Sequence, residues 1–260
     1  MRSRARTTGS ASVSSKLSNS THFFFEPDQL DRDICTFGRE ESDHILKSFR
    51  LYIGDMLLAT DGCGNLYNMQ IAAYENKLVK ARTVKVSRNV NELPVAITVG
   101  FGLPQQSKAD QIFDQCTQLG VTGFIPIISK NSPSKLTPEK SRERIKRWRK
   151  VVISSMKQSL RSVLPDISEP VDIEDAVALF GMYDLILLGS LKGPSFQADM
   201  TKSAKKMLLL TGPEEGFSRI EEDTLIRAGA KPVLLGDRRL RAELAPIVLA
   251  TLAGLGRWVD

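Results

Sequence analysis

The stretch Met207-Leu-Leu-Leu-Thr-Gly-Pro-Glu-Glu-Gly-Phe217 decides the fold. Its first four residues are apolar, which is typical of a strand buried on both faces of a parallel sheet. The glycines and the proline that follow predict a tight turn at the end of that strand. Similar apolar runs recur at helix-length intervals: Val95–Gly102, Gly123–Ile128, Tyr183–Gly189 and Pro232–Gly236. We therefore predict an α/β domain over residues 93–260, with a mostly parallel sheet covered by helices on both sides.

A smaller, β-rich domain is predicted over residues 21–92. Turn residues that tolerate positive φ, such as those of Asp61-Gly-Cys-Gly-Asn65, separate short segments of strand character. One helix is expected from about Glu41 to Phe49. The expected strands are His22–Glu26, Met56–Thr60, Leu66–Tyr74 and Lys77–Val86. Their length and spacing predict a small barrel.

The segment 1–20 holds four Lys/Arg residues, seven serines and no acidic residue. It contains too little apolar surface to offset the entropy lost on ordering, so we predict a disordered basic tail. An acid-free, Arg- and Ser-rich start is also typical of organelle transit peptides, although this one lacks an amphipathic apolar face. A targeting role for the tail stays open.

The composition argues against several classes of protein. No apolar run approaches the roughly 18 residues that a membrane span needs, so we expect a soluble, cytoplasmic protein without a membrane partner. Cys35, Cys63 and Cys116 lie far apart, and His22 and His44 are the only histidines. Neither a disulfide framework nor the ligand spacing of a zinc site is present. We expect a reducing compartment and no metal.

Common nucleotide and hydrolase fingerprints are also missing. The segment Gly100-Phe-Gly102 lacks a third glycine and runs into Pro104 where a helix should begin. Neither the phosphate-binding loop G-x-x-x-x-G-K-[ST] nor the nucleophile elbow G-x-S-x-G occurs. A dinucleotide enzyme, a P-loop NTPase and an α/β hydrolase are therefore disfavoured.

Each of the last three predicted strands ends in a glycine-containing turn. These turns are Leu188-Gly-Ser190, Gly212-Pro-Glu-Glu-Gly216 and Leu235-Gly236, the last continuing to Leu240. Ligands of open α/β sheets bind outside the carboxyl ends of the strands. Three unrelated turns are the alternative, but their succession at neighbouring strand ends favours one shared small-molecule site built largely from backbone groups.

Positive charge is concentrated between Lys130 and Arg161. Eleven Lys/Arg residues face only Glu139 and Glu143 there, for a net charge of +9, whereas the whole chain carries +6. The segment reads as a helix opened by Thr137-Pro138, with an apolar stripe that includes Trp148 as a core residue. A focused basic surface is typical of a protein that binds nucleic-acid phosphates, although a solvated helix face is the alternative.

Several motifs together resemble the RsmE family of 16S ribosomal RNA uridine-N3 methyltransferases. The resemblance covers about residues 22–258. It rests on the following stretches: His44-Ile-Leu-Lys-Ser-Phe-Arg50 with Gly54-Asp55, Leu103 to Leu119 with Ile125-Pro126, Lys157-Gln-Ser-Leu-Arg-Ser-Val-Leu-Pro165, Gly212-Pro-Glu-Glu-Gly-Phe-Ser218, and Leu235-Gly-Asp-Arg-Arg-Leu-Arg-Ala-Glu-Leu-Ala245.

The resemblance implies a fold, a cofactor and a substrate. The fold would be an N-terminal PUA-like RNA-binding β-barrel joined to a C-terminal SPOUT domain, whose final segment is threaded into a trefoil knot. The cofactor would be S-adenosylmethionine, and the partner would be 16S rRNA or the small ribosomal subunit. The apolar segment from Leu244 to Leu255 would form the interface of a homodimer.

The site residues follow from these arguments. Uracil N3 carries a proton that must leave, so Glu214 or Glu243 is a candidate base, and Arg161 and Arg241 are candidates to stabilise the developing anion. Phosphate binding by the arginines and helix capping by Glu243 are the alternatives. The expected cofactor-binding residues are Leu188, Gly189, Ser190, Gly212, Pro213, Glu214, Gly216, Leu235, Gly236 and Leu240, and the expected RNA-binding residues are Arg50, Lys146, Arg147, Lys150, Gln158 and Ser159.

Some positions differ from the residues that are usual in the family. Lys157 stands where the family usually has Glu, and Glu215 stands where it often has Gly. Ala242 and Leu244 flank Glu243, where hydroxyl residues are common. These departures leave two further interpretations. One is an RNA-binding ribosome-assembly factor without catalytic activity, and cofactor affinity would separate it from an enzyme. The other is a tRNA methyltransferase of the same fold.

Overall fold

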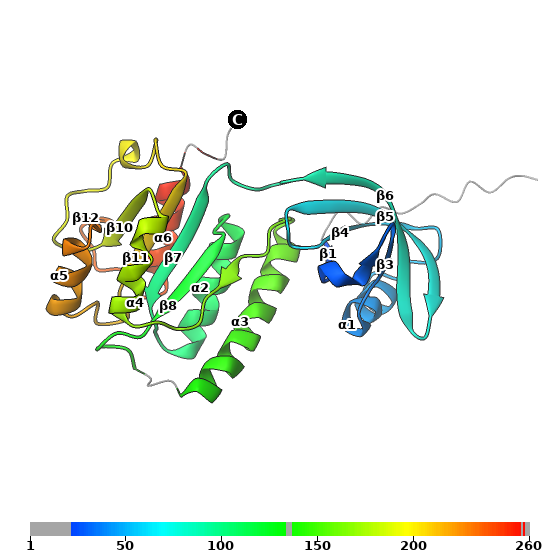
Figure 1. Cartoon of the computed structure of the whole chain (residues 1–260), viewed down its shortest axis with the longest axis horizontal. Helices are drawn as coiled ribbons and strands as arrows, with labels where there is room; N and C mark the ends of the chain where they lie inside the picture. The colour runs from blue at the N-terminus through cyan, green and yellow to red at the C-terminus, as the bar shows by residue number, and fades with distance from the viewer. Residues whose placement is uncertain (1–21, 134–136, 256, 258–260) are drawn as a thin grey trace, which may run out of the picture.

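The computed structural model describes residues 22–133, 137–255 and 257, and two parts are evident in Figure 1. The predicted tail of residues 1–20 lies outside the described residues. The smaller part, called the barrel below, is a curled six-stranded sheet in the order β1-β4-β5-β6-β3-β2, a half-barrel with open edges. Its elements are β1 (Phe23–Phe24), a 3-10 turn (Pro27–Gln29), β2 (Leu30–Asp31), β3 (Ile34–Thr36), α1 (Arg39–Asp43), a π-helical turn (His44–Ser48), β4 (Met56–Thr60), β5 (Asn65–Glu75) and β6 (Leu78–Arg88).

The larger part contains a second six-stranded sheet in the order β12-β10-β11-β7-β8-β9. Every strand pair in it is parallel, as the apolar runs predict. Its strands are β7 (Ala96–Gly102), β8 (Gly123–Ile127), β9 (Asp166–Ile167), β10 (Leu185–Gly189), β11 (Lys206–Thr211) and β12 (Lys231–Val233). Its helices are α2 (Gln106–Gln118), α3 (Pro138–Gln158), α4 (Ile173–Ala178), α5 (Arg219–Arg227) and α6 (Leu244–Gly254), with 3-10 turns at Phe180–Met182 and Ala198–Met200.

Helices cover both faces of this sheet, so it is a three-layer α/β arrangement (Figure 1). One apolar cluster joins one face of the strands to α2, α3 and α6. A second joins the other face to α4 and α5. Neighbouring residues of β11 illustrate the division, because Leu209 belongs to the first cluster and Leu208 to the second. Burial on both faces accounts for the continuous apolar character of the strands.

Helix α3 forms as its sequence predicts. The Thr137 side chain caps its start by accepting a hydrogen bond from the Lys140 amide, and Pro138 occupies the first turn. Trp148, Val152 and Met156 are fully buried. The prediction that Trp148 belongs to the core is therefore confirmed.

Strand β12 is enclosed by the chain that leaves β10. It pairs with β10 along one edge, while Leu234, just after it, pairs with Ser195 in the connection that follows β10. The enclosure is tight: a Cβ on Gly193 would lie 2.5 Å from the Pro232 carbonyl carbon. Such close packing of a late segment between β10 and the connection that follows it is compatible with the trefoil knot that the family resemblance implies. The strand is shorter than predicted because residues 234–240 turn away to form a loop.

The two parts meet along the segment that follows α3. The Leu164 amide donates to the Gly62 carbonyl over 2.8 Å, and the Gly64 amide donates to the Ser162 carbonyl over 3.0 Å. The Thr60 hydroxyl also donates to the Ser162 carbonyl. This backbone pairing orders the segment against the barrel and fixes how the two parts are joined.

Among the described residues, no helix is long and apolar enough to cross a membrane. The same residues contain no group of three or more His, Cys, Asp or Glu side chains arranged to hold a metal ion. Cys35 and Cys116 are buried free thiols, and Cys63 is an exposed one.

Candidate functional site

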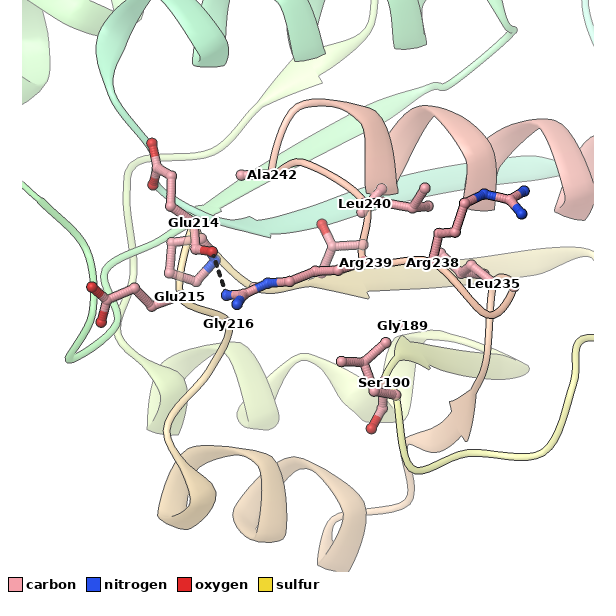
Figure 2. Close-up of a pocket in the computed structure, with 16 residues that line it drawn as sticks. Gly189, Ser190, Glu214, Glu215, Gly216, Leu235, Arg238, Arg239, Leu240 and Ala242 are labelled. Carbon is pink, nitrogen blue, oxygen red and sulfur yellow. Dashed lines mark hydrogen bonds between the residues drawn. The ribbon is translucent and has the colours of Figure 1, made fainter.

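The turns that follow β10, β11 and β12 meet around one pocket at the carboxyl edge of the sheet (Figure 2). The cavity has a volume of about 330 Å³. Adjacent parallel strands deliver their ends to the same edge, which explains why turns far apart in sequence converge. The lining residues are Gly189, Ser190, Leu191, Thr211, Gly212, Pro213, Glu214, Glu215, Gly216, Leu235, Gly236, Arg238, Arg239, Leu240, Ala242 and Ala245.

All of the predicted cofactor-binding residues except Leu188 line this pocket. Leu188 is 1% exposed and faces the apolar cluster beneath α4 and α5 instead. It lies one residue before the strand end, and a strand residue there points into the layer below. The Leu188 side chain therefore does not line the pocket, while the other predicted residues are brought together as expected.

Backbone packing shapes the loop after β11. A Cβ on Gly212 would lie 2.5 Å from the Phe217 amide nitrogen, so only glycine fits there without a shift of the loop. The Gly216 amide donates to the Pro213 carbonyl over 2.9 Å, and Gly216 has a φ of +78°. The loop is thus a compact turn that presents its backbone to the pocket.

Two buried polar atoms of the pocket wall lack a hydrogen-bond partner among the described residues, the Thr211 hydroxyl oxygen and Oε2 of Glu214. Such a group usually finds a protein, water or ligand partner, because its burial alone costs free energy. Sequence analysis missed Thr211, since a threonine at a strand end carries no signal of its own.

Glu214 is held in its charged form at the edge of the pocket. Its carboxylate accepts hydrogen bonds from Lys108 Nζ over 2.9 Å and from the Gln105 amide over 3.2 Å. Burial by itself would raise the pKa of Glu214, but these donors outweigh burial and hold the pKa below its usual value. A general base works best with a pKa near the working pH. The environment therefore favours a structural role for Glu214 over the predicted catalytic one.

Arg239 links two walls of the pocket. Its guanidinium crosses from the loop after β12 and donates to the Glu214 carbonyl over 3.0 Å (Figure 2). Arg238 also lines the pocket, but its side chain points away from Arg239. Sequence analysis did not single out either arginine.

Beneath the opposite wall, the Ser190 hydroxyl donates to the Glu222 carboxylate. The second oxygen of that carboxylate accepts from Lys192 Nζ over 3.0 Å. Burial alone would raise the pKa of Glu222, but the hydrogen bonds from Ser190 and Lys192 lower it overall. The network fixes the Ser190 side chain below the pocket.

Glu243 and Arg241 lie beside the pocket at the start of α6. The Glu243 side chain is 15% exposed, and its Oε1 is 4.0 Å from an Arg241 terminal nitrogen. Its Oε2 is buried without a hydrogen-bond partner among the described residues, and its side chain forms no capping bond to the described part of α6. Capping, the alternative interpretation, is therefore not observed. Arg241 is 86% exposed and extends into solvent.

The structure does not bring Arg161 to the pocket. Its side chain is 2% exposed at the junction between the two parts and pairs with Glu92 at 2.6 Å. The guanidinium also donates to the carbonyls of Thr117 and Val121, each over 2.7 Å. The Glu92 carboxylate accepts from the Ser162 and Val163 amides as well. With its donors occupied, Arg161 is placed to join the domains, and we replace the predicted catalytic role with a structural one.

Ion pairs with acidic side chains neutralise part of the positive charge of α3. Arg147 binds Asp110 of α2, while Arg149 and Lys157 reach into the barrel to Glu26 and Glu41. Because these acids are distant in sequence, local charge counts overestimate the free charge of α3.

The predicted RNA-binding residues lie on α3, at or just beyond its C-terminal end, and on the barrel. Lys146 and Lys150 are exposed and line a groove of about 900 Å³ between α3 and the barrel. Gln158 is exposed at the end of α3, but the Ser159 hydroxyl is turned inward to the Ser155 carbonyl. Arg50 is exposed on the barrel.

Comparisons with known proteins agree with this architecture. A family model described as an RNA methyltransferase domain matches residues 91–254. The ribosomal RNA small subunit methyltransferase E of Synechocystis sp. is 30% identical over 229 residues, which cover 85% of this chain and 73% of that protein. The protein of the same name from Bacillus subtilis is 24% identical over 216 residues, covering 80% of this chain and 84% of the relative.

Two solved structures share the fold. A ribosomal RNA small subunit methyltransferase E from Neisseria gonorrhoeae, bound to S-adenosyl methionine, superposes with a TM-score of 0.80 at 22% identity. The alignment covers 90% of this chain and 96% of that one. A probable rRNA-methyltransferase from Porphyromonas gingivalis gives a TM-score of 0.78 at 26% identity, covering 90% and 97% of the two chains.

Proposed function

The chain belongs to the RNA methyltransferase family that includes the ribosomal RNA small subunit methyltransferase E proteins, and we propose that it methylates N3 of a uridine in 16S rRNA with S-adenosylmethionine as the donor. The observation that carries the proposal is the pocket formed by the three strand-end turns. It lies at the carboxyl edge of a parallel sheet, where such folds bind their ligands.

The residues present fit this cofactor. Backbone groups of Gly212 to Gly216 and Leu235 to Leu240 would hold its adenosine part, and the unpartnered Thr211 hydroxyl offers one more hydrogen bond. Leu235 and Leu240 line the pocket and would supply apolar surface for the adenine ring. When bound, S-adenosylmethionine supplies a methyl group activated by the adjacent sulfonium.

Transfer to uracil requires loss of the N3 proton and an in-line approach of N3 to the methyl carbon. Oε2 is buried without a hydrogen-bond partner among the described residues in both Glu214 and Glu243. We assign the proton to the Glu243 carboxylate, because the other oxygen of Glu214 accepts a hydrogen bond from Lys108, whereas Glu243 lies beside the pocket with only a 4.0 Å contact to Arg241. Arg241, exposed at the same edge, would stabilise the negative charge that develops on the uracil oxygens. The N3 lone pair then forms the bond to carbon as the carbon–sulfur bond breaks.

Binding of the RNA would involve α3 and the barrel. Lys146 and Lys150 are exposed along the groove between them and suit phosphate contacts. Helix α6 leaves Leu244 42% exposed beside an otherwise apolar surface, which favours the predicted homodimer. Sedimentation at micromolar protein concentration tests the dimer, and a monomer there would contradict it.

The proposed target is tested by mass mapping of RNA from cells that lack the protein. We expect one small-subunit uridine to lose a methyl group, and to regain it when the gene is restored. A loss in tRNA instead would favour the tRNA-modifying alternative. An unchanged methylation pattern, together with no cofactor binding by calorimetry, would favour a non-catalytic assembly factor.

A further inference from the structure

The turn from Leu51 to Asp55, between the π-helical turn and β4, exposes two consecutive large apolar side chains. Tyr52 is 68% exposed and Ile53 is 60% exposed. An isolated exposed apolar residue is ordinary, but two consecutive large ones on one turn expose an unusual amount of apolar side chain, and we refer to these two side chains as the patch. The patch lies on the barrel, outside the pocket described above.

Hydrogen bonds order the backbone of this turn, so Tyr52 and Ile53 are exposed on an ordered segment. The Tyr52 amide donates to the Asp55 carboxylate over 2.8 Å, and the Asp55 amide donates to the Tyr52 carbonyl over 3.0 Å. The Gly54 amide donates a hydrogen bond to the Ile71 carbonyl, and the Gly54 carbonyl accepts one from the Gln70 side-chain amide. A rigid aromatic side chain loses little entropy on binding, which suits it to a recognition role.

A tyrosine hydroxyl on β5 secures the other end of the turn. Tyr74 donates to the Leu51 carbonyl over 2.5 Å, and Leu51 itself is buried in the barrel core. Asp55 is 9% exposed, so its carboxylate is committed to the turn and not to solvent. The outward surface of the turn is therefore apolar and carries no exposed negative charge of its own.

The segment that carries the patch holds more basic than acidic residues, and three of its cations, Lys47, Lys80 and Arg82, are paired with acidic side chains. Residues 44–91 contain seven Lys/Arg and three acidic residues, and two of those acids, Asp55 and Asp61, are buried. Arg50, directly before the turn, is exposed and has a left-handed φ of 52°.

The acidic residues of the barrel lie mainly elsewhere. Seven of them occur in residues 22–43, and two, Glu26 and Glu41, bind cations of α3. Helix α3 thus pairs with two acids of the barrel, Glu26 and Glu41, and the Tyr52 turn lies in a segment with more basic than acidic residues. An apolar aromatic patch next to an exposed arginine complements a nucleobase attached to phosphate better than it complements an apolar protein surface.

We propose that Tyr52 stacks on an unpaired base of the RNA substrate, with Arg50 binding the adjoining phosphate and Ile53 packing against the exposed edge of the base. The identity of the RNA rests on the proposed function. The base must be unpaired, because bases inside a duplex are already stacked and present no free face. The turn would therefore select a loop or bulge of the RNA at a distance from the methylated uridine.

The test uses an RNA hairpin with 2-aminopurine in its loop and a duplex of equal length without a loop. Stacking of Tyr52 should quench the 2-aminopurine fluorescence. Tyr52→Ala should abolish the quench and weaken hairpin binding roughly 5- to 150-fold, while duplex binding stays unchanged. Tyr52→Phe should bind almost as the wild type does, since the ring and not the hydroxyl makes the contact.

Met182→Ala removes another large apolar side chain, 57% exposed on the larger domain, and serves as the matched control. It should leave hairpin binding unchanged, and calorimetry with S-adenosylmethionine should give the same affinity for all variants. Equal hairpin affinity of Tyr52→Ala and the wild type would overturn the proposal. So would an equal loss for hairpin and duplex, or a change in sedimentation showing that the patch binds a second copy. A wild-type chain that binds no RNA would overturn the proposed function as well.

Discussion

Arg161→Ala should destabilise the protein strongly while leaving the chemical step almost intact. Arg161 and Glu92 have side chains that are 2% and 6% exposed, and they pair at 2.6 Å. The substitution leaves the Glu92 carboxylate buried without its cation, and it leaves the carbonyls of Thr117 and Val121 without this donor. Loss of one partner from such a pair costs about 3–5 kcal/mol. At roughly 2–4 °C for each kcal/mol in a chain of this size, the midpoint of thermal unfolding should fall by roughly 6–20 °C.

The matched control is Arg149→Ala, which breaks another arginine–glutamate contact between the two domains. Arg149 and Glu26 are 45% and 48% exposed, so the loss should be about 0–1 kcal/mol. Urea unfolding measures both free energies, and single-turnover methylation at saturating RNA and low temperature measures the chemistry of the folded fraction. Wild-type stability of Arg161→Ala together with methylation slowed about 100-fold would refute the structural assignment and restore a catalytic one.

Three further substitutions test other parts of the account. Gly212→Ala should abolish cofactor binding in calorimetry, because the new Cβ would lie 2.5 Å from backbone of the same loop; retained affinity would mean that this loop does not form the cofactor wall. Because the folded pKa of Glu214 is lowered, its contact with Lys108 should contribute stability above the usual carboxyl pKa and lose it as pH falls through the lowered value. Lys108→Met should reduce that pH dependence in urea titrations between about pH 3 and pH 7, and an identical profile would argue against the contact. Replacing Lys146 and Lys150 with Gln should flatten the salt dependence of RNA binding by up to about one unit of slope per contact, whereas an unchanged slope would identify a solvated helix face.

The pocket could be predicted from the sequence because its signals lie in short stretches of consecutive residues. Glycine and proline turns follow apolar runs directly, and the geometry of parallel strands brings their ends to one edge. The sequence could not show that the Leu188 side chain lies in the core, since the exact last residue of a strand decides whether a side chain enters the pocket or the core. Thr211, Arg238 and Arg239 were missed because single residues at these positions carry no pattern.

Contacts between distant residues account for the errors on charged side chains. Arg161 follows a basic helix and suggests a nucleic-acid or catalytic role, but its partner Glu92 is 69 residues away. The same applies to Lys157 and Glu41, which pair across the domains at 2.7 Å. Charge patterns in sequence identify basic segments reliably, but only the fold determines which of their charges remain free.

Isotope transfer to defined RNA tests the central claim most directly. Purified protein would be incubated with small ribosomal subunits that lack the modification and with S-adenosylmethionine carrying a trideuterated methyl group, and the RNA digest would be analysed by mass spectrometry. The account predicts labelled 3-methyluridine at one site of 16S rRNA and its loss with the Gly212→Ala variant. Absence of label with the wild-type protein, or label only in another nucleoside or in tRNA, would contradict it.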